Sequence, residues 1–377
     1  MSNSPFHLGW LALGLVPGLG PRSAGKLLGA FGDPEGIFRA PLTELESQGL
    51  PAALAQAIHS QRALRQAEGE LKRVQEIGCR LVTWNDAAYP RLLREIYDPP
   101  PLLYIQGNPD VLSRHAVAIV GTRRPTPYGN QMSERLGRDL AEQGLVIASG
   151  LARGIDTLAH RGALKAGTGT TVAVVGCGID VVYPKENKRL FEEIAAGQGA
   201  VVTELPTGSP PMPQNFPVRN RIIAGMALGT VVVEGTEHSG SLITARLAME
   251  FGREVYGVPG NASQPNSYGP NHLIKQGAKL VTGWQDVIEE LPTAVRAALA
   301  PVEPTTAAER ASLVIESLSG PQRVLYELLG ADESRHIDEL VESSNLSSSE
   351  TLAALLDLEM KGYIRQLPGK QFVKVML

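Results

Sequence analysis

Between residues 113 and 291, short runs rich in Val and Ile alternate with amphipathic segments of helix length. Seven of these runs are candidate strands, at residues 116–120, 145–148, 171–175, 200–203, 230–234, 254–258 and 279–282. Strands that alternate with helices favour an α/β fold, in which a parallel sheet is covered by helices on both faces. Ligands of such sheets bind at the carboxyl ends of the strands, near the point where the strand order reverses. The residues that follow each run are therefore the candidate functional residues.

Other parts of the chain predict further domains around this Rossmann-like core of residues 113–291. We expect a helical domain at 1–68, a connecting segment at 69–112, an Ala-, Pro- and Thr-rich linker at 292–317 and a winged helix at 318–377. The winged helix is predicted from three helix-like segments, at 322–329, 337–343 and 348–361, and a hairpin formed by 363–367 and 372–375. The connecting segment contains two candidate strands, at 80–84 and 102–106. The sequence leaves open whether these strands extend the core sheet or only link two domains.

The N-terminal domain contains a Gly18-Leu19-Gly20 turn followed by a segment with Arg22 and Lys26 on one helical face. This pattern resembles a helix-hairpin-helix, whose backbone N–H groups contact DNA phosphates without reading bases. Alternatively, the glycines only form a tight turn between two packed helices. We favour the second interpretation, because two cations give a weak electrostatic attraction for DNA.

Charge and cysteine content limit the classes of function that fit. The chain has a net charge of −4, and residues 113–291 hold 17 Lys and Arg against 16 Asp and Glu. A nucleic-acid site must therefore be a focused patch. Two cysteines far apart, Cys79 and Cys177, argue against a disulfide framework or a zinc site and fit a reducing cytoplasm. We expect no membrane insertion, because the chain has neither a signal-peptide pattern nor an apolar run of membrane-spanning length.

The common motifs of nucleotide-dependent and hydrolytic enzymes are absent from the sequence. No G-x-G-x-x-G follows the first strand, and no Walker loop, H-E-x-x-H or G-x-S-x-G occurs. Asp156 and His160 lie four residues apart, and we interpret them as a polar pair on a helix rather than as metal ligands. We therefore expect no cofactor, no metal and no catalytic residue.

Four strand ends or helix starts carry glycines, most of them beside hydroxyl or cationic residues, and a fifth segment that opens a helix carries two arginines, which is the chemistry of anion binding. Glycine lets the backbone approach a ligand, helix N-termini attract anions, and arginine binds phosphate with two parallel hydrogen bonds. Each group also has a purely structural alternative, such as a helix cap, close packing or an ion pair with a carboxylate like Glu234. The five groups are Gly121, Thr122, Arg123 and Arg124; Ser149 and Gly150; Gly176 and Gly178; Arg219, Asn220 and Arg221; and Ser239, Gly240 and Ser241.

Five such groups along one sheet edge favour an extended ligand over a mononucleotide. Four aromatic residues, Tyr128, Tyr183, Phe191 and Phe216, lie close to these loops in the sequence and are candidates to stack on bases. The sequence therefore predicts a site for the phosphate backbone of a single-stranded nucleic acid.

The predicted recognition helix of the winged helix, residues 348–361, is acidic. It carries Glu350, Asp357 and Glu359 against Lys361, and carboxylates in a DNA groove would be repelled by phosphates. We interpret the winged helix as a protein-contact or regulatory module, with duplex DNA as the alternative ligand.

The motifs at 121–123, 149–156, 176–184, 216–223 and 234–245, and the order of the domains, resemble the DNA-processing protein A (DprA/Smf) family. The resemblance implies a non-enzymatic cytoplasmic protein of natural transformation (competence) that protects incoming single-stranded DNA. It also implies a homodimer formed through the Rossmann core that loads a RecA-type recombinase, with a single-strand-binding protein as a further candidate partner. Arg123 and Lys188 are the implied phosphate ligands, with Lys185 as the competing lysine. We also include Phe191, which lies close to these loops in the sequence, in the predicted DNA-binding site.

A second hypothesis is an enzyme that acts on a mononucleotide, because the core also resembles the lysine-decarboxylase-like group. Proteins of that group carry a Pro-Gly-Gly-x-Gly-Thr phosphate loop. This chain has Glu-Gly-Thr-Glu-His-Ser-Gly at residues 234–240 instead, which counts against the enzyme hypothesis.

Overall fold

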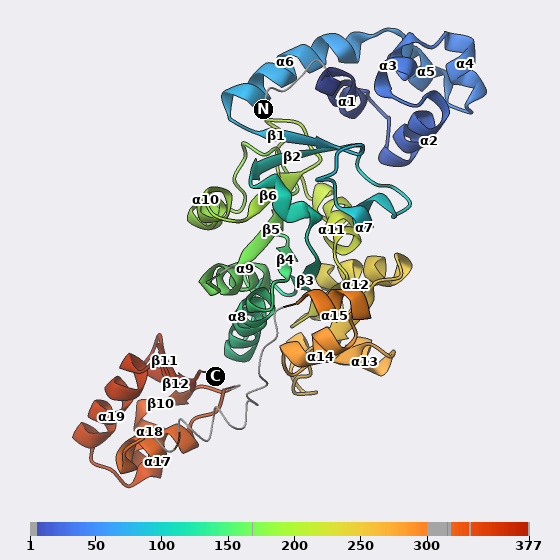
Figure 1. Ribbon diagram of the computed structural model, residues 1–377. Coiled ribbons are helices and arrows are strands. Elements are labelled where there is room, and N and C mark those ends of the chain that lie inside the picture. The colour runs from blue at the N-terminus through green and yellow to red at the C-terminus, as the bar shows by residue number, and fades with distance from the viewer. Residues whose placement is uncertain (1–5, 168, 300–314, 316–317, 332, 376–377) are drawn as a thin grey trace.

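The computed structural model describes residues 6–167, 169–299, 315, 318–331 and 333–375. Within these residues a nine-stranded sheet forms the centre, with a helical domain at one edge and a small α/β tail below it (Figure 1). The strands of the sheet are β1 (Arg80–Thr83), β2 (Leu102–Gly107), β3 (Ala116–Val120), β4 (Val146–Ser149), β5 (Thr170–Val174), β6 (Ala200–Thr203), β7 (Gly229–Val232), β8 (Glu254–Gly257) and β9 (Lys279–Leu280).

The strand order is β1-β2-β6-β5-β4-β3-β7-β8-β9, and all strand pairs from β6 to β9 are parallel. The predicted α/β fold class is therefore confirmed, and each predicted strand of the core is present. Ala118 of β3 lies opposite Ala148 of β4 on one side and Thr230 of β7 on the other. The chain first builds the sheet outward from β3 to β6 and then returns to add β7. The loops after β3 and β7 therefore diverge at the switch point where ligands of such sheets bind.

The two strands of the connecting segment extend the core sheet, which answers the question that the sequence left open. β2 pairs antiparallel with β6, with Tyr104 opposite Thr203, and β1 pairs antiparallel with β2. The preceding helix α6 (Arg62–Glu76) continues across the predicted boundary at residues 68 and 69. Residues on both sides of that boundary thus belong to one continuous helix that leads into the sheet.

Helices cover both faces of the sheet (Figure 1). On one face, Leu136 and Leu140 of α8 are fully buried against Val117 and Ile147. On the other face, α11 buries Ile222 and Ile223 in a second cluster. α8 repeats apolar residues at helical spacing and so buries one stripe, whereas the second half of α11 is buried on all sides. The helices that follow the N-terminal domain are α7 (Arg91–Arg94), α8 (Pro127–Glu142), α9 (Ile155–Lys165), α10 (Lys188–Ala196), α11 (Asn215–Met226), α12 (Gly240–Glu250), α13 (Tyr268–Lys275), α14 (Trp284–Glu289) and α15 (Thr293–Ala298).

The N-terminal helices share a hydrophobic core with the β1 and β2 edge of the sheet. Trp10 and Leu27 belong to the same buried cluster as Leu102 and Tyr104. The predicted glycine turn joins α1 to α2, and Lys26 Nζ donates to the Gln48 carbonyl at 2.6 Å, so this cation supports the domain itself. The remaining helices of this domain are α1 (Phe6–Leu15), α2 (Pro21–Phe31), α3 (Pro34–Arg39), α4 (Leu42–Ser47) and α5 (Ala52–His59).

The tail has the predicted winged-helix architecture of three helices and a hairpin. A two-residue strand, β10, adds a third strand that the sequence did not reveal because it is so short. Part of the predicted linker, 300–314 and 316–317, lies outside the described residues, and α15 occupies the beginning of that linker. The elements of the tail are α17 (Gly320–Leu328), β10 (Arg335–His336), α18 (Ile337–Ser344), α19 (Ser348–Met360), β11 (Ile364–Leu367) and β12 (Gln371–Lys374).

Candidate nucleic-acid interface

A groove with a volume of about 680 Å³ lies at the carboxyl ends of β3 and β7, at the switch point of the sheet. A smaller pocket adjoins it, and Arg123, Tyr183, Phe216 and Arg219 line both. The sequence-predicted residues that line the groove are Gly121, Thr122, Arg123, Arg124, Arg219, Asn220, Ser239, Gly240 and Ser241, and the smaller pocket adds Gly150 and Gly176.

The loop after β3 presents two exposed arginines at the mouth of the groove. The Thr122 N–H donates to the Glu234 carbonyl at 2.7 Å, which fixes the loop against the end of β7. A Cβ atom at Gly121 would lie 2.5 Å from Ile155 Cγ1, so only glycine allows this close approach. Among the described residues, no ion pair is found for either Arg123 or Arg124. Both guanidinium groups therefore remain available for an anionic ligand.

Two aromatic rings lie beside the first of these arginines. The Arg123 guanidinium carbon lies 5.7 Å from the centroid of the Phe216 ring, within the range of a cation–π contact. The Phe216 and Tyr183 rings are 5.5 Å apart between centroids and inclined by 33°. Tyr183 is 39% exposed. A cation and two aromatic rings, from two loops and the start of α11, thus meet in the groove, which can bind a phosphate and stack on bases.

The loop after β4 already contains an anion of its own. The backbone N–H groups of Gly150 and Ala152 donate to Asp156 Oδ2 at 3.1 and 3.3 Å. Ser149 is fully buried, and its Oγ donates to the Ile119 carbonyl at 2.6 Å. The predicted phosphate contacts of Ser149 and Gly150 are therefore corrected. These residues shape the loop, and the Asp156 carboxylate already accepts the hydrogen bonds of the N–H groups that a phosphate would need.

Arg219 connects this loop to α11. It is 6% exposed, and its Nη1 donates to the Gly150 carbonyl at 2.7 Å and also to the Val174 carbonyl. Burial raises the pKa of Asp156 to about 6, although the nearby Arg219 guanidinium favours the charged carboxylate. Burial also lowers the pKa of Arg219 to about 10, so it stays charged at neutral pH. Arg219 lines the groove but is primarily a clamp between the ends of β4 and β5.

Arg221 does not reach the groove. It is 4% exposed and pairs with Asp98 at 3.1 Å and Glu204 at 2.5 Å. Positions two apart on a helix do not share a face, so Arg219 and Arg221 point to different surroundings. The predicted phosphate role of Arg221 is corrected to a buried ion-pair network. Its partners are also not the suggested Glu234, whose carboxylate instead accepts from the backbone N–H and hydroxyl of Thr126.

Phe191 and Gly178 also have structural surroundings. Phe191 is 7% exposed and belongs to the hydrophobic cluster beneath α10, so its ring cannot stack on a base in this conformation. The Gly178 N–H donates to the Ser209 carbonyl at 2.9 Å, and a Cβ atom there would lie 2.8 Å from the Pro206 carbonyl. Their predicted DNA contacts are corrected to packing roles.

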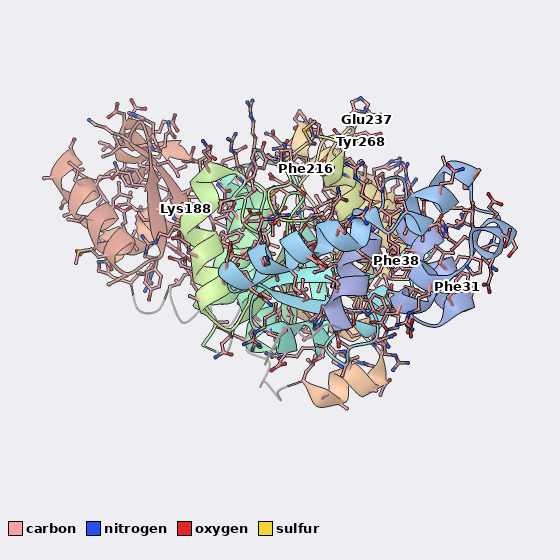
Figure 2. The ribbon with its side chains drawn as sticks, turned by 90° about the horizontal axis from the view of Figure 1, so that it is seen from above. Phe31, Phe38, Lys188, Phe216, Glu237 and Tyr268 are labelled. Carbon is pink, nitrogen blue, oxygen red and sulfur yellow. The ribbon has the colours of Figure 1, made fainter. Side chains whose placement is uncertain are left out.

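The predicted lysines lie beyond the groove, on the segment that leads into α10. The Lys188 side chain is 70% exposed, and its Nζ lies 3.8 Å from Glu192 Oε1. Figure 2 shows Lys188 well apart from Phe216. Lys185 belongs to the short helical turn that precedes it. Asn187 anchors the segment, because its Nδ2 donates to the Leu151 carbonyl at 2.9 Å. Beyond the groove, this segment therefore carries cations and carboxylates together, with Lys188 near Glu192 and Arg189 paired with Glu193.

The sequence prediction did not include several lining residues of the groove and the pocket, among them the polar residues Asn266, Thr236 and Arg153. Asn266 follows β8 and donates from Nδ2 to the Arg124 carbonyl at 2.9 Å, and Thr236 lies beside the start of α12. Arg153 lines the smaller pocket and pairs with Glu186 at 2.6 Å. Arg153 lies within a motif that the sequence revealed, so its strand-end position was a usable signal. Asn266 offered none, because 142 residues separate it from Arg124.

The described residues offer no arrangement for a metal. No group of three His, Cys, Asp or Glu side chains among them has suitable geometry. Asp156 and His160 have separate partners: His160 Nδ1 lies 2.6 Å from Thr171 Oγ1, and burial lowers the pKa of His160 to about 3.

The second hypothesis, an enzyme that acts on a mononucleotide, would need residues 234–240 to take the place of a phosphate loop. The Gly235 N–H of this segment already donates to the Asn266 carbonyl at 2.6 Å. Within the same described parts, no helix has the length and apolar character that crossing a bilayer requires.

The fold and the groove define a Rossmann-type α/β protein with a cationic and aromatic groove at its switch point and a winged-helix tail. The family model described as DNA recombination-mediator protein A matches residues 80–292, and the model of the DprA winged helix domain matches residues 295–370. The chain therefore belongs to the DprA/Smf family of DNA recombination mediators.

Relatives and solved structures agree with this assignment. Protein Smf of Synechocystis is 34% identical over 96% of this chain and 97% of its own length. The DNA processing protein DprA of Streptococcus pneumoniae is 49% identical over 54% of this chain and 72% of its own length. The X-ray structure of the Streptococcus pneumoniae protein covers 78% of this chain and 99% of its own, with a TM-score of 0.68 and 38% identity. A structure of the Helicobacter pylori protein, described for its single-stranded DNA binding mode, has a TM-score of 0.51 and 32% identity over 56% of this chain and 94% of its own.

Proposed function

We propose that this chain binds single-stranded DNA in the groove at the switch point, without reading its sequence and without catalysing a reaction on it. The observation that carries the proposal is Arg123, an exposed arginine without an ion pair among the described residues that lies over the Phe216 ring. A phosphate can bind the guanidinium while an unpaired base stacks on the aromatic surface. The single-stranded DNA binding described for the Helicobacter pylori relative supports this choice of ligand.

The path of the strand follows from the arrangement of donors. Arg123, Phe216 and Tyr183 lie together where the groove adjoins the smaller pocket, and the start of α12 contributes Ser239 and Ser241, whose hydroxyls lie 2.7 Å apart. From there the strand continues past the pocket at Arg153 toward Lys185 and Lys188. Bases in a duplex are already stacked on each other, so only an unpaired strand gains from the aromatic rings. The groove therefore favours single-stranded over duplex DNA.

A non-catalytic role agrees with the chemistry of the groove. Its one carboxylate lining residue, Asp156, is bound to two backbone N–H groups next to Arg219 and is not free to act as a base. The groove residues of this part of the structure include no histidine and no cysteine. We infer that the groove binds and positions DNA and leaves it chemically unchanged.

The wider role is that of a recombination mediator of natural transformation. We propose that the chain protects incoming single-stranded DNA and loads a RecA-type recombinase onto it, as a homodimer in the bacterial cytoplasm. The description of the family as recombination mediators supports this role. A single-strand-binding protein is the further partner that we propose, because it occupies the same DNA.

The test is fluorescence anisotropy with labelled poly-dT and with a duplex of equal length, across a salt series. We expect salt-sensitive binding that is tighter for the single strand. Arg123→Ala should weaken binding to any sequence and reduce the salt slope by about one. Arg91→Ala is the matched control, since Arg91 is 92% exposed on α7 and does not line the groove. Preference for the duplex, or equal salt slopes for Arg123→Ala and the wild type, would contradict the proposal.

A further inference from the structure

Helix α19 of the winged helix carries apolar side chains on its solvent-facing side. Leu352, Leu356 and Met360 are spaced four residues apart and so share one helical face. They are 54%, 58% and 80% exposed, whereas Leu355 and Leu358 on the other face are 1% and 0% exposed. The hydrophobic core of the tail includes Leu355 and Leu358 but none of the three exposed side chains. In Figure 1, α19 lies on the outer side of the tail, away from the central sheet.

The exposed face borders a groove with a volume of about 480 Å³ between α18, α19 and the hairpin. Scattered exposed apolar residues are normal, but a contiguous patch beside a groove marks a site of interaction. The large apolar side chains that line this groove are Ile337, Val341, Leu352, Leu355, Leu356 and Phe372.

The charge around this groove determines which partner fits. Residues 337–360 contain six carboxylates and no Lys or Arg: Asp338, Glu339, Glu342, Glu350, Asp357 and Glu359. The Asp338 side chain is 86% exposed, and Asp338 and Glu359 line the groove together with a single cation, Lys370. DNA phosphates would be repelled by this face, and a cationic partner would be attracted to it.

We propose that this groove docks an amphipathic helix of a partner protein, whose apolar face is bordered by Lys and Arg. Leu352 and Met360 are eight residues apart, or about 12 Å along α19, so two to three turns of a partner helix match the stripe. A second copy of this chain is a poorer occupant, because a symmetric contact would bring two acidic faces together.

The experiment uses the full chain and a fluorescein-labelled peptide of Leu and Lys, with the leucines at helical spacing. A peptide of Leu and Glu with the same spacing is the charge control. We expect the full chain to bind the Leu/Lys peptide about tenfold or more tightly than the Leu/Glu peptide. The double variant Leu352→Ser, Leu356→Ser should weaken that binding about tenfold or more. Val324→Ser, at a 39% exposed position on α17 that does not line the groove, should leave it unchanged.

A second variant tests the charge without touching the apolar surface. Glu339→Lys, Glu342→Lys should weaken binding of the Leu/Lys peptide, and circular dichroism should show that both double variants keep the helical content of the wild type. Equal affinity for the two peptides, or unchanged affinity in the leucine variant, would overturn the proposal. So would duplex DNA binding, or self-association in sedimentation, that only the leucine variant loses, because these results would assign the groove to DNA or to a second copy.

Discussion

Replacing Asp156 by Ala tests whether the loop after β4 depends on its own internal anion. The change leaves the N–H groups of Gly150 and Ala152 without their acceptor and removes the carboxylate beside the buried Arg219. An unsatisfied buried donor costs about 1–3 kcal/mol. Because the two N–H groups share one acceptor atom, we expect the core to lose about 1–3 kcal/mol of stability.

The measurement is hydrogen exchange by mass spectrometry at increasing denaturant, read on peptides from β4 and β5. This readout isolates the core, whereas a single unfolding midpoint would average over several domains. Asp180→Ala is the matched control: Asp180 Oδ1 accepts one exposed backbone bond from Gly208 at 2.8 Å, so its loss should cost about 1 kcal/mol or less. If Asp156→Ala changed the exchange free energy no more than Asp180→Ala does, the internal-anion explanation of this loop would be refuted.

Three further predictions concern the groove and its surroundings. Phe216→Ala should weaken binding of poly-dT by about 1–3 kcal/mol, whereas Tyr97→Ala, at a 58% exposed position outside the groove, should not change it in the same anisotropy assay. Arg221→Ala should destabilise the core by about 3–5 kcal/mol in hydrogen exchange, because it leaves two carboxylates without their cation, but it should keep the wild-type salt slope for DNA. The pKa of Asp156 is raised from its ordinary value of 3.8 to about 6, so its contribution to stability is fully present below about pH 4 and is lost as the pH rises through 6. Relative to Asp156→Asn, the wild type should therefore lose about 1–3 kcal/mol between pH 4 and 7, and a pH-independent difference would contradict the raised pKa.

The sheet could be predicted from the sequence because its strands are buried on both faces and read as short apolar runs. Ala116–Val120 is such a run, and the structure gives β3 the same bounds. The position of β1 and β2 was not predictable in the same way. β2 pairs antiparallel with β6 and brings Tyr104 opposite Thr203, a contact between residues that are far apart in the sequence, and β1 pairs with β2. Local sequence patterns predict where strands occur, but they do not specify which distant strands pair or in which register.

The sequence could predict the part of the candidate site that is formed by the residues at the strand ends. Glycine next to a hydroxyl or cationic residue at a strand end indicated the loops, and nine predicted residues do line one groove. The sequence could not distinguish a residue that faces the groove from one that supports it. Arg123 follows β3 and is exposed, whereas Arg219 lies in α11 and donates to the carbonyls of Gly150 and Val174. That difference depends on which groups of other strands surround each guanidinium.

The supporting residues explain why the exposed ones can act on a ligand. A loop that binds phosphate must hold its cations in place without neutralising them, so its own polar groups need partners elsewhere. Here Asp156 satisfies the N–H groups of the β4 loop, and Arg219 satisfies the carbonyls at the ends of β4 and β5. Because these two charges lie close together in the interior, they offset each other. The loop of Arg123 and Arg124 is fixed by backbone bonds to Glu234 and Ile155 and by the Asn266 side chain, so the two arginines carry the unbalanced positive charge at the mouth of the groove.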